Sequence, residues 1–241
     1  MDEGMTRRDF LYGTAATGAV LMAGNFVPGS SWAKEAVNIS ETEKIVITVI
    51  TDNYAEITRR SEKIAKRHVG RTILESAMHA EHGLSYQIET VVNGKSHACL
   101  FDFAVDAQGV MRNMKLLNID LTKIEAIGLS HDHFDHQAAL IEILKTNKDA
   151  FRKPMPFYVG EQFFVGTYAK RPDGNVANLF ALKREDIEGL GFVKIVEVKG
   201  PTPIIPGAYL PGKVEQVTEY EKVPPQFVVK KGNEYVQETF P

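Results

Sequence analysis

Cysteine is almost absent from this chain of 241 residues, in which Cys99 is the single cysteine. A single cysteine excludes an intramolecular disulfide, so no oxidative cross-link holds the fold in any compartment. Cys99 lies in an apolar run, and we expect a small buried hydrophobic residue there rather than a nucleophile or a ligand. A strong charge of either sign is missing as well, because the net charge is −3. We therefore expect neither nucleic acid nor an anionic membrane surface as a partner.

The sequence also lacks internal repeats, low-complexity tracts and a second domain boundary. Hydrophobic residues make up 44% of the chain, an ordinary share for a globular protein with a real core. We therefore expect residues 34–241 to form one domain.

The first 33 residues are expected to lie outside that domain. Residues 6–11 (Thr-Arg-Arg-Asp-Phe-Leu) resemble the twin-arginine export motif, and an apolar segment rich in Gly and Ala follows them. Residues 31–33 (Ser-Trp-Ala) then offer a small-x-small cleavage site. This order predicts a signal peptide over residues 1–33, export to the periplasm, and no membrane contact after cleavage. The alternative is an uncleaved N-terminal anchor.

Hydrophobic periodicity predicts an α/β fold for the rest of the chain. Apolar or alternating runs predict strands over residues 44–51, 85–92, 96–102, 124–130, 157–159, 192–198, 226–229 and 234–236. Helices are expected over residues 72–80, 108–117 and 137–145, the first of them closed by Gly83. Four prolines and three glycines in residues 200–212 favour an ordered turn or loop. Residues 161–182 show no clear pattern.

Residues 130–136 (Ser-His-Asp-His-Phe-Asp-His) carry the chemistry of the chain. In an extended segment His131 and His133 point to the same side, and Asp135 and His136 follow where the chain turns into a helix. Four donors within six residues can therefore converge on one metal ion. Imidazole nitrogen and carboxylate oxygen suit Zn²⁺, Mn²⁺ or Fe. The alternative is a surface loop in which Asp135 caps a helix.

The pattern H-x-H-x-D-H, placed between a buried strand and a helix, resembles the signature of the metallo-beta-lactamase superfamily. Residues 51–53, 80–85, 100–102 and 204–207 resemble landmarks of the dihydropterin-ribofuranosylaminobenzene-phosphate synthase-like branch. The match runs from about residue 44 to about residue 221. The resemblance implies an αββα sandwich built from two similar βα halves.

The resemblance also implies roles for individual residues. His131 and His133 would hold a first zinc ion, and Asp135 and His136 would hold a second and orient the reacting water. Asp132 occupies a position that is not a ligand in the family. Asp102 would orient a ligand histidine, or else cap a turn. His82 lies in a matching segment, where we expect an ordinary turn histidine.

The chain departs from the family pattern in two places. The usual Phe-Asp-Thr-Gly is replaced by Phe-Asp-Phe-Ala at residues 101–104, and no histidine follows His136. We therefore expect the second half of the fold to be incomplete, as in a truncated chain or one half of a two-chain site. Neither metal then has three sure protein ligands, whereas a catalytic zinc normally has three.

These observations predict an exported metal-dependent hydrolase that acts on a small molecule. A metal-bound hydroxide would attack an ester, amide, lactone or phosphodiester. The alternative is an inactive metal-binding relic, or a chain whose site is completed by a partner.

Overall fold

The computed structural model describes residues 40–214, 217–220 and 222–238. All of these residues belong to one compact unit. The predicted export signal at residues 1–33 lies outside the described residues. None of the described helices is long and apolar enough to cross a membrane.

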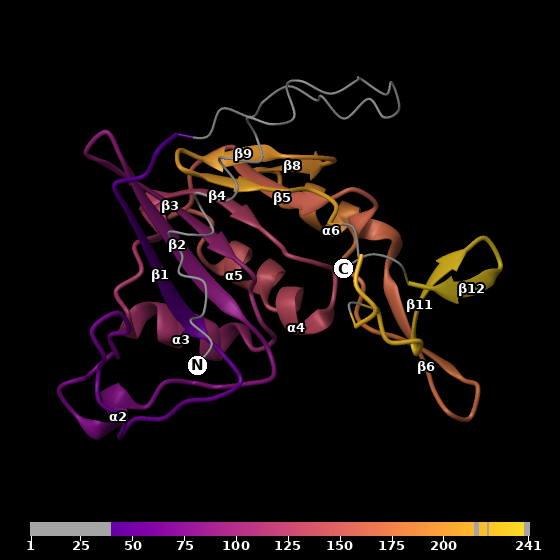
Figure 1. Cartoon of the computed structure of the whole chain (residues 1–241), viewed down its shortest axis with the longest axis horizontal. Coiled ribbons are helices and arrows are strands. Elements are labelled where there is room, and N and C mark those ends of the chain that lie inside the picture. Colours follow the sequence, from indigo (N-terminus) through magenta and orange to yellow (C-terminus); the bar gives the residue numbers. More distant parts are fainter. Residues whose placement is uncertain (1–39, 215–216, 221, 239–241) are drawn as a thin grey trace, which may run out of the picture. The chain divides into compact units, whose positions relative to one another are not determined.

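The largest sheet has six strands in the order β1-β2-β3-β4-β5-β8 (Figure 1). They are β1 (Lys44–Thr51), β2 (Ser85–Val92), β3 (Lys95–Phe101), β4 (Ile124–Gly128), β5 (Met155–Gly160) and β8 (Val193–Val198). The first three strands pair antiparallel, and β3, β4, β5 and β8 pair parallel. Helices connect the parallel strands, as such crossovers require, and the expected α/β fold is confirmed.

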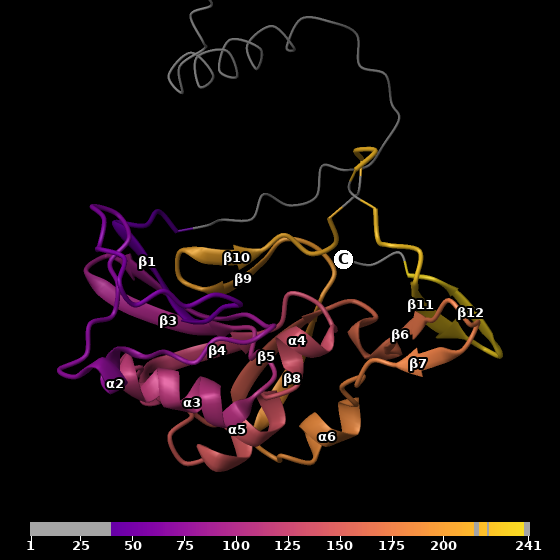
Figure 2. The ribbon, with the colours of Figure 1, turned by 90° about the horizontal axis from the view of Figure 1, so that it is seen from below.

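The two faces of this sheet are covered by different elements. Helices α3 (Ala107–Leu116) and α5 (Leu140–Thr146) lie on one side, and the hairpin of β9 (Thr202–Ile205) and β10 (Ala208–Leu210) lies on the other (Figure 2). Side chains of β3 alternate between these faces, so Leu100 joins the main core with the helices while Cys99 contacts the smaller cluster under β9.

Strand β1 forms one edge of the sheet and is only partly covered. Ile45, Ile47 and Val49 are 58%, 62% and 47% exposed, because they share the face opposite α3 and lie away from the hairpin. Within the described residues, no strand pairs with the outer edge of β1.

A second, antiparallel sheet of four strands has the order β12-β11-β6-β7. Its strands are β6 (Thr167–Lys170), β7 (Val176–Asn178), β11 (Phe227–Lys231) and β12 (Glu234–Gln237). Strands β6 and β7 fall in the segment for which the sequence suggested no assignment. Short helical turns complete the fold at α2 (Ile73–Ser76), α4 (Phe134–Gln137), α6 (Arg184–Glu188), η1 (Leu121–Lys123) and η2 (Phe163–Val165).

Three local expectations were wrong. The helix expected over residues 72–80 is the single turn α2, and Gly83 does not close it. A side chain at Gly83 would instead meet the carbonyl of Asp135 at 2.7 Å, so this glycine allows two loops to approach closely. The helix expected over residues 137–145 is divided into α4 and α5, and residues 200–212 contain the β9–β10 hairpin rather than only a loop.

Candidate metal centre

The histidine motif begins just beyond the carboxyl end of β4, beside the end of β3. Parallel neighbours end at the same edge of a sheet, so Asp102 after β3 lies next to Ser130 after β4. Helix α4 then begins at Phe134, with His133 at its N-cap position and no side-chain cap. Asp135 lies in the first turn of α4, so the alternative that it caps the helix was wrong.

Asp102 is the buried carboxylate that holds the motif together. It is 4% exposed and accepts hydrogen bonds of 2.8 Å from the backbone N–H of Ser130, from Ser130 Oγ and from His136 Nδ1. Because the carboxylate is an acceptor, His136 must carry a proton on Nδ1. This leaves the lone pair on Nε2, the nitrogen that can then bind a metal.

Three histidine rings of the motif lie against one another. The ring centroids of His131 and His136 are 4.1 Å apart, and those of His131 and His133 are 4.6 Å apart. Burial, together with the neighbouring His136 and His133, lowers the pKa of His131 to about 4. His131 is therefore neutral at pH 7, which is the form that binds metal ions.

The carboxylate of Asp135 lies between two imidazole rings, those of His136 and His82. Its Oδ2 lies 3.6 Å from His136 Nε2 and 3.6 Å from His82 Nε2. His82 is largely exposed, so this carboxylate borders solvent at the mouth of the loop. The histidine expected only to occupy a turn is therefore a neighbour of the motif.

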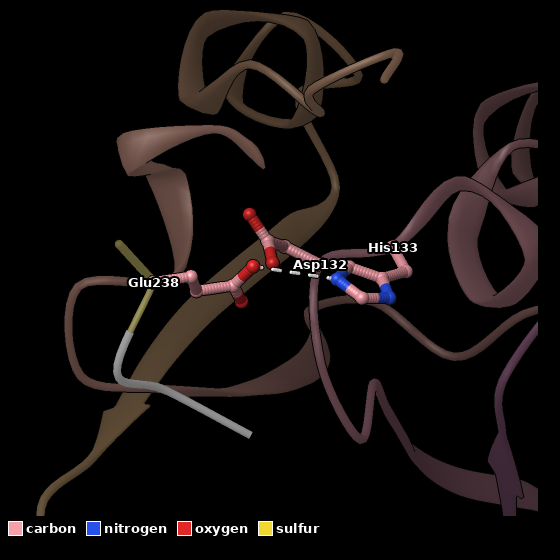
Figure 3. Close-up of side chains that lie close together, drawn as sticks. All are labelled: Asp132, His133 and Glu238. Carbon is pink, nitrogen blue, oxygen red and sulfur yellow. Dashed lines mark hydrogen bonds and ion pairs between the residues drawn. The ribbon is translucent and has the colours of Figure 1, made fainter. Parts of the chain in front are cut away.

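Asp132, His133 and Glu238 form a separate cluster (Figure 3). One ligand atom from each lies within 4.8 Å of the other two, and they are the one such group of three among the described residues. His133 Nε2 is 3.5 Å from Glu238 Oε2, and Thr167 Oγ1 donates to Asp132 Oδ1 at 2.9 Å. Glu238 is 3% exposed although it stands near the end of the chain.

The charges in this cluster influence each other strongly. Burial raises the pKa of Asp132 to about 6, opposed by the hydrogen bond from Thr167 and assisted by the charge of Glu238. Burial disfavours the charged form of His133, but the hydrogen bond and charge of Glu238 outweigh it and raise the pKa of that imidazole. The protonation of Asp132 and of His133 therefore depends on the charge of Glu238.

The donors of this cluster fit a divalent cation. Two ligands on one tetrahedral zinc, each about 2.0–2.2 Å from the ion, stand about 3.4 Å apart. The 3.5 Å between His133 and Glu238 matches this spacing, and it exceeds the roughly 2.7–2.9 Å of a strong charged hydrogen bond. One nitrogen and two carboxylates are also a donor set that zinc accepts.

The predicted ligands divide between these two groups. His133 belongs to the cluster with Glu238, whereas His131, Asp135 and His136 lie outside it, so that their role as ligands stays a prediction. Asp132 was set aside because the family does not use this position. Glu238 was missed because it lies 105 residues after His133 and no local pattern marks it.

Comparison with known proteins identifies a relative but no matching family model. The chain is 31% identical over 191 residues to the 7,8-dihydropterin-6-methyl-4-(beta-D-ribofuranosyl)-aminobenzene-5′-phosphate synthase of Methanocaldococcus jannaschii. The match covers 78% of this chain and 58% of the synthase.

Solved structures of the metallo-beta-lactamase fold are also similar, at low scores. A subclass B3 metallo-beta-lactamase of Bradyrhizobium japonicum is 17% identical with a TM-score of 0.35, covering 63% of this chain and 53% of that one. A quorum-quenching N-acyl homoserine lactone lactonase is 16% identical with a TM-score of 0.31, covering 52% of this chain and 49% of that one. The chain is thus similar in sequence to a pterin synthase over most of its own length, and it spans little more than half of that relative.

Proposed function

We propose that this chain is a metal-dependent hydrolase of small molecules, with its centre at residues 130–136. The observation that carries the proposal is the hydrogen bond of 2.8 Å from His136 to Asp102, with the tilted ring of His131 at 4.1 Å from that of His136. A buried carboxylate that fixes the tautomer of a histidine is typical of metal sites. A bound zinc ion would supply a water molecule with a pKa near 7 and would polarise the bond to be cleaved.

The residues of the chain have distinct tasks in this proposal. Asp102 fixes the proton of His136 on Nδ1, so that Nε2 stays free for the metal. His131 remains neutral because it is buried beside two other imidazoles. Asp135, which borders solvent next to His82, would hold a proton of the reacting water.

A bond-forming reaction at the same centre is the second candidate. It is favoured by the 31% identity to a protein named as a synthase. Because the chain spans 58% of that relative, the activity of the whole relative comes to this chain only as a proposal. Export through residues 1–33 is proposed for the hydrolase. A site completed by a partner chain is a separate alternative.

Metal content and hydrolysis should be measured together on the full chain. We expect metal bound in a fixed ratio to protein, and cleavage of at least one of three probes: a p-nitrophenyl ester, a lactone and bis-p-nitrophenyl phosphate. His131→Ala should abolish cleavage, whereas His68→Ala, at a histidine remote from the motif, should not. Fixed metal content without cleavage of any probe would refute the hydrolase and leave the synthase, the relic or the partner-completed site. Retention of full activity in His131→Ala would refute the centre itself.

A further inference from the structure

The four-stranded sheet is joined to the histidine motif by a small set of contacts. Thr167 at the start of β6 donates to Asp132, and Glu238 directly after β12 faces His133. These two polar contacts join the sheet, with Glu238, to the histidine motif. The ring of Phe227 in β11 adds an apolar contact, with its centroid 4.7 Å from that of His133.

The contact between His133 and Glu238 is unfavourable as a simple ion pair. Glu238 is almost fully buried, and among the described residues its carboxylate has one contact, 3.5 Å long. A buried carboxylate with so weak a partner is costly, because the attraction does not offset the lost hydration. Asp132 adds a second carboxylate to the same place, so one imidazole faces two acids.

A divalent cation would remove both difficulties at once. It would neutralise two carboxylates, and it would need no movement of His133 and Glu238, which already stand at the spacing of two zinc ligands. Thr167 would then orient Asp132 from outside, as hydrogen-bonding groups around a metal commonly do.

We propose that Asp132, His133 and Glu238 bind a divalent cation that clamps the C-terminal sheet onto the histidine motif. The chain has no histidine after His136, so in this proposal the ligand from the C-terminal part is the carboxylate of Glu238. The clamp does not rest on the proposed function, whose tasks fall to Asp102, His131, Asp135 and His136. Binding of the cation is coupled to the docking of β11 and β12, because Asp132 and His133 come from the motif and Glu238 comes from the end of β12.

Zinc affinity and hydrogen exchange of the full chain test the clamp. We expect Glu238→Gln to weaken Zn²⁺ binding by roughly 10–100-fold, as measured by calorimetry. Glu234→Gln, an exposed glutamate in β12, is the matched control and should leave the affinity unchanged. In the wild-type chain, added Zn²⁺ should slow amide exchange in residues 227–238, and this measurement needs no variant.

Different failures point to different conclusions. Equal Zn²⁺ affinity in the wild type, Glu238→Gln and Glu234→Gln would overturn the clamp, and so would unchanged exchange in residues 227–238. If the clamp were overturned in this way and His131→Ala bound less metal than the wild type, the proposed hydrolase centre would still be supported. Loss of affinity in Glu238→Gln without hydrolysis of any probe would support the clamp and refute the hydrolase.

Discussion

Asp102→Asn is the substitution that tests the organisation of the motif most directly. Asparagine has nearly the same shape, and it tolerates the positive φ of 55° that Asp102 adopts. Its oxygen can still accept from the backbone of Ser130, but its amide places a donor where Oδ2 received the proton of His136. Ser130 Oγ, which also donates to Oδ2, can rotate to accept from the amide, so the bond that the variant removes is the one from His136. Loss of this charged hydrogen bond in a buried site costs about 1.5–3 kcal/mol of unfolding free energy.

The same change should also act on metal binding. His136 can satisfy the new donor only by moving its proton to Nε2, and this removes the lone pair that we expect to bind metal. We expect metal affinity to fall roughly 10–100-fold. Urea unfolding of the metal-free protein, followed by circular dichroism, gives the stability, and Zn²⁺ titration gives the affinity. Asp149→Asn, at an exposed surface aspartate, is the control. If Asp102→Asn matches this control in both measurements, Asp102 does not organise the site.

Two further predictions concern the scaffold. Burial raises the pKa of Cys99 to about 12. The thiol should therefore resist a disulfide reagent at pH 8 in the native chain and react fully in urea. Rapid reaction of the native chain would contradict the burial of this thiol. Asn113→Leu should lower the unfolding free energy by about 2–4 kcal/mol in urea titration, because buried partners at Ile50 and His79 lose their hydrogen bonds. A loss below the error of the titration would show that water replaces the amide.

The strands of the large sheet could be predicted because their signal is local. Residues 44–51 are rich in β-branched side chains and coincide with β1, and the Asn93-Gly94 turn fixes the register of β2 and β3. The histidine motif could be recognised for the same reason, since its donors lie within six residues.

The second sheet and Glu238 depend on contacts that no local pattern records. Strands β6 and β7 are short and mixed in polarity, so tertiary pairing with β11 rather than propensity defines them. Glu238 is buried only because the end of β12 meets the motif loop. The helix expected over residues 72–80 shortened to α2 because none of the residues in that turn is buried, and isolated helices of this length are not stable.

The edge strand β1 has a consequence for the behaviour of the protein at high concentration. Its sequence, Lys-Ile-Val-Ile-Thr-Val-Ile-Thr, combines an outer edge with which no described strand pairs and three protruding aliphatic side chains. Such an edge is a template on which another extended chain can add, and natural proteins usually block it with a charge or a proline. Here the only charge in the strand stands at its first residue, Lys44, so a lysine introduced at Ile47 would act as a gatekeeper against self-association.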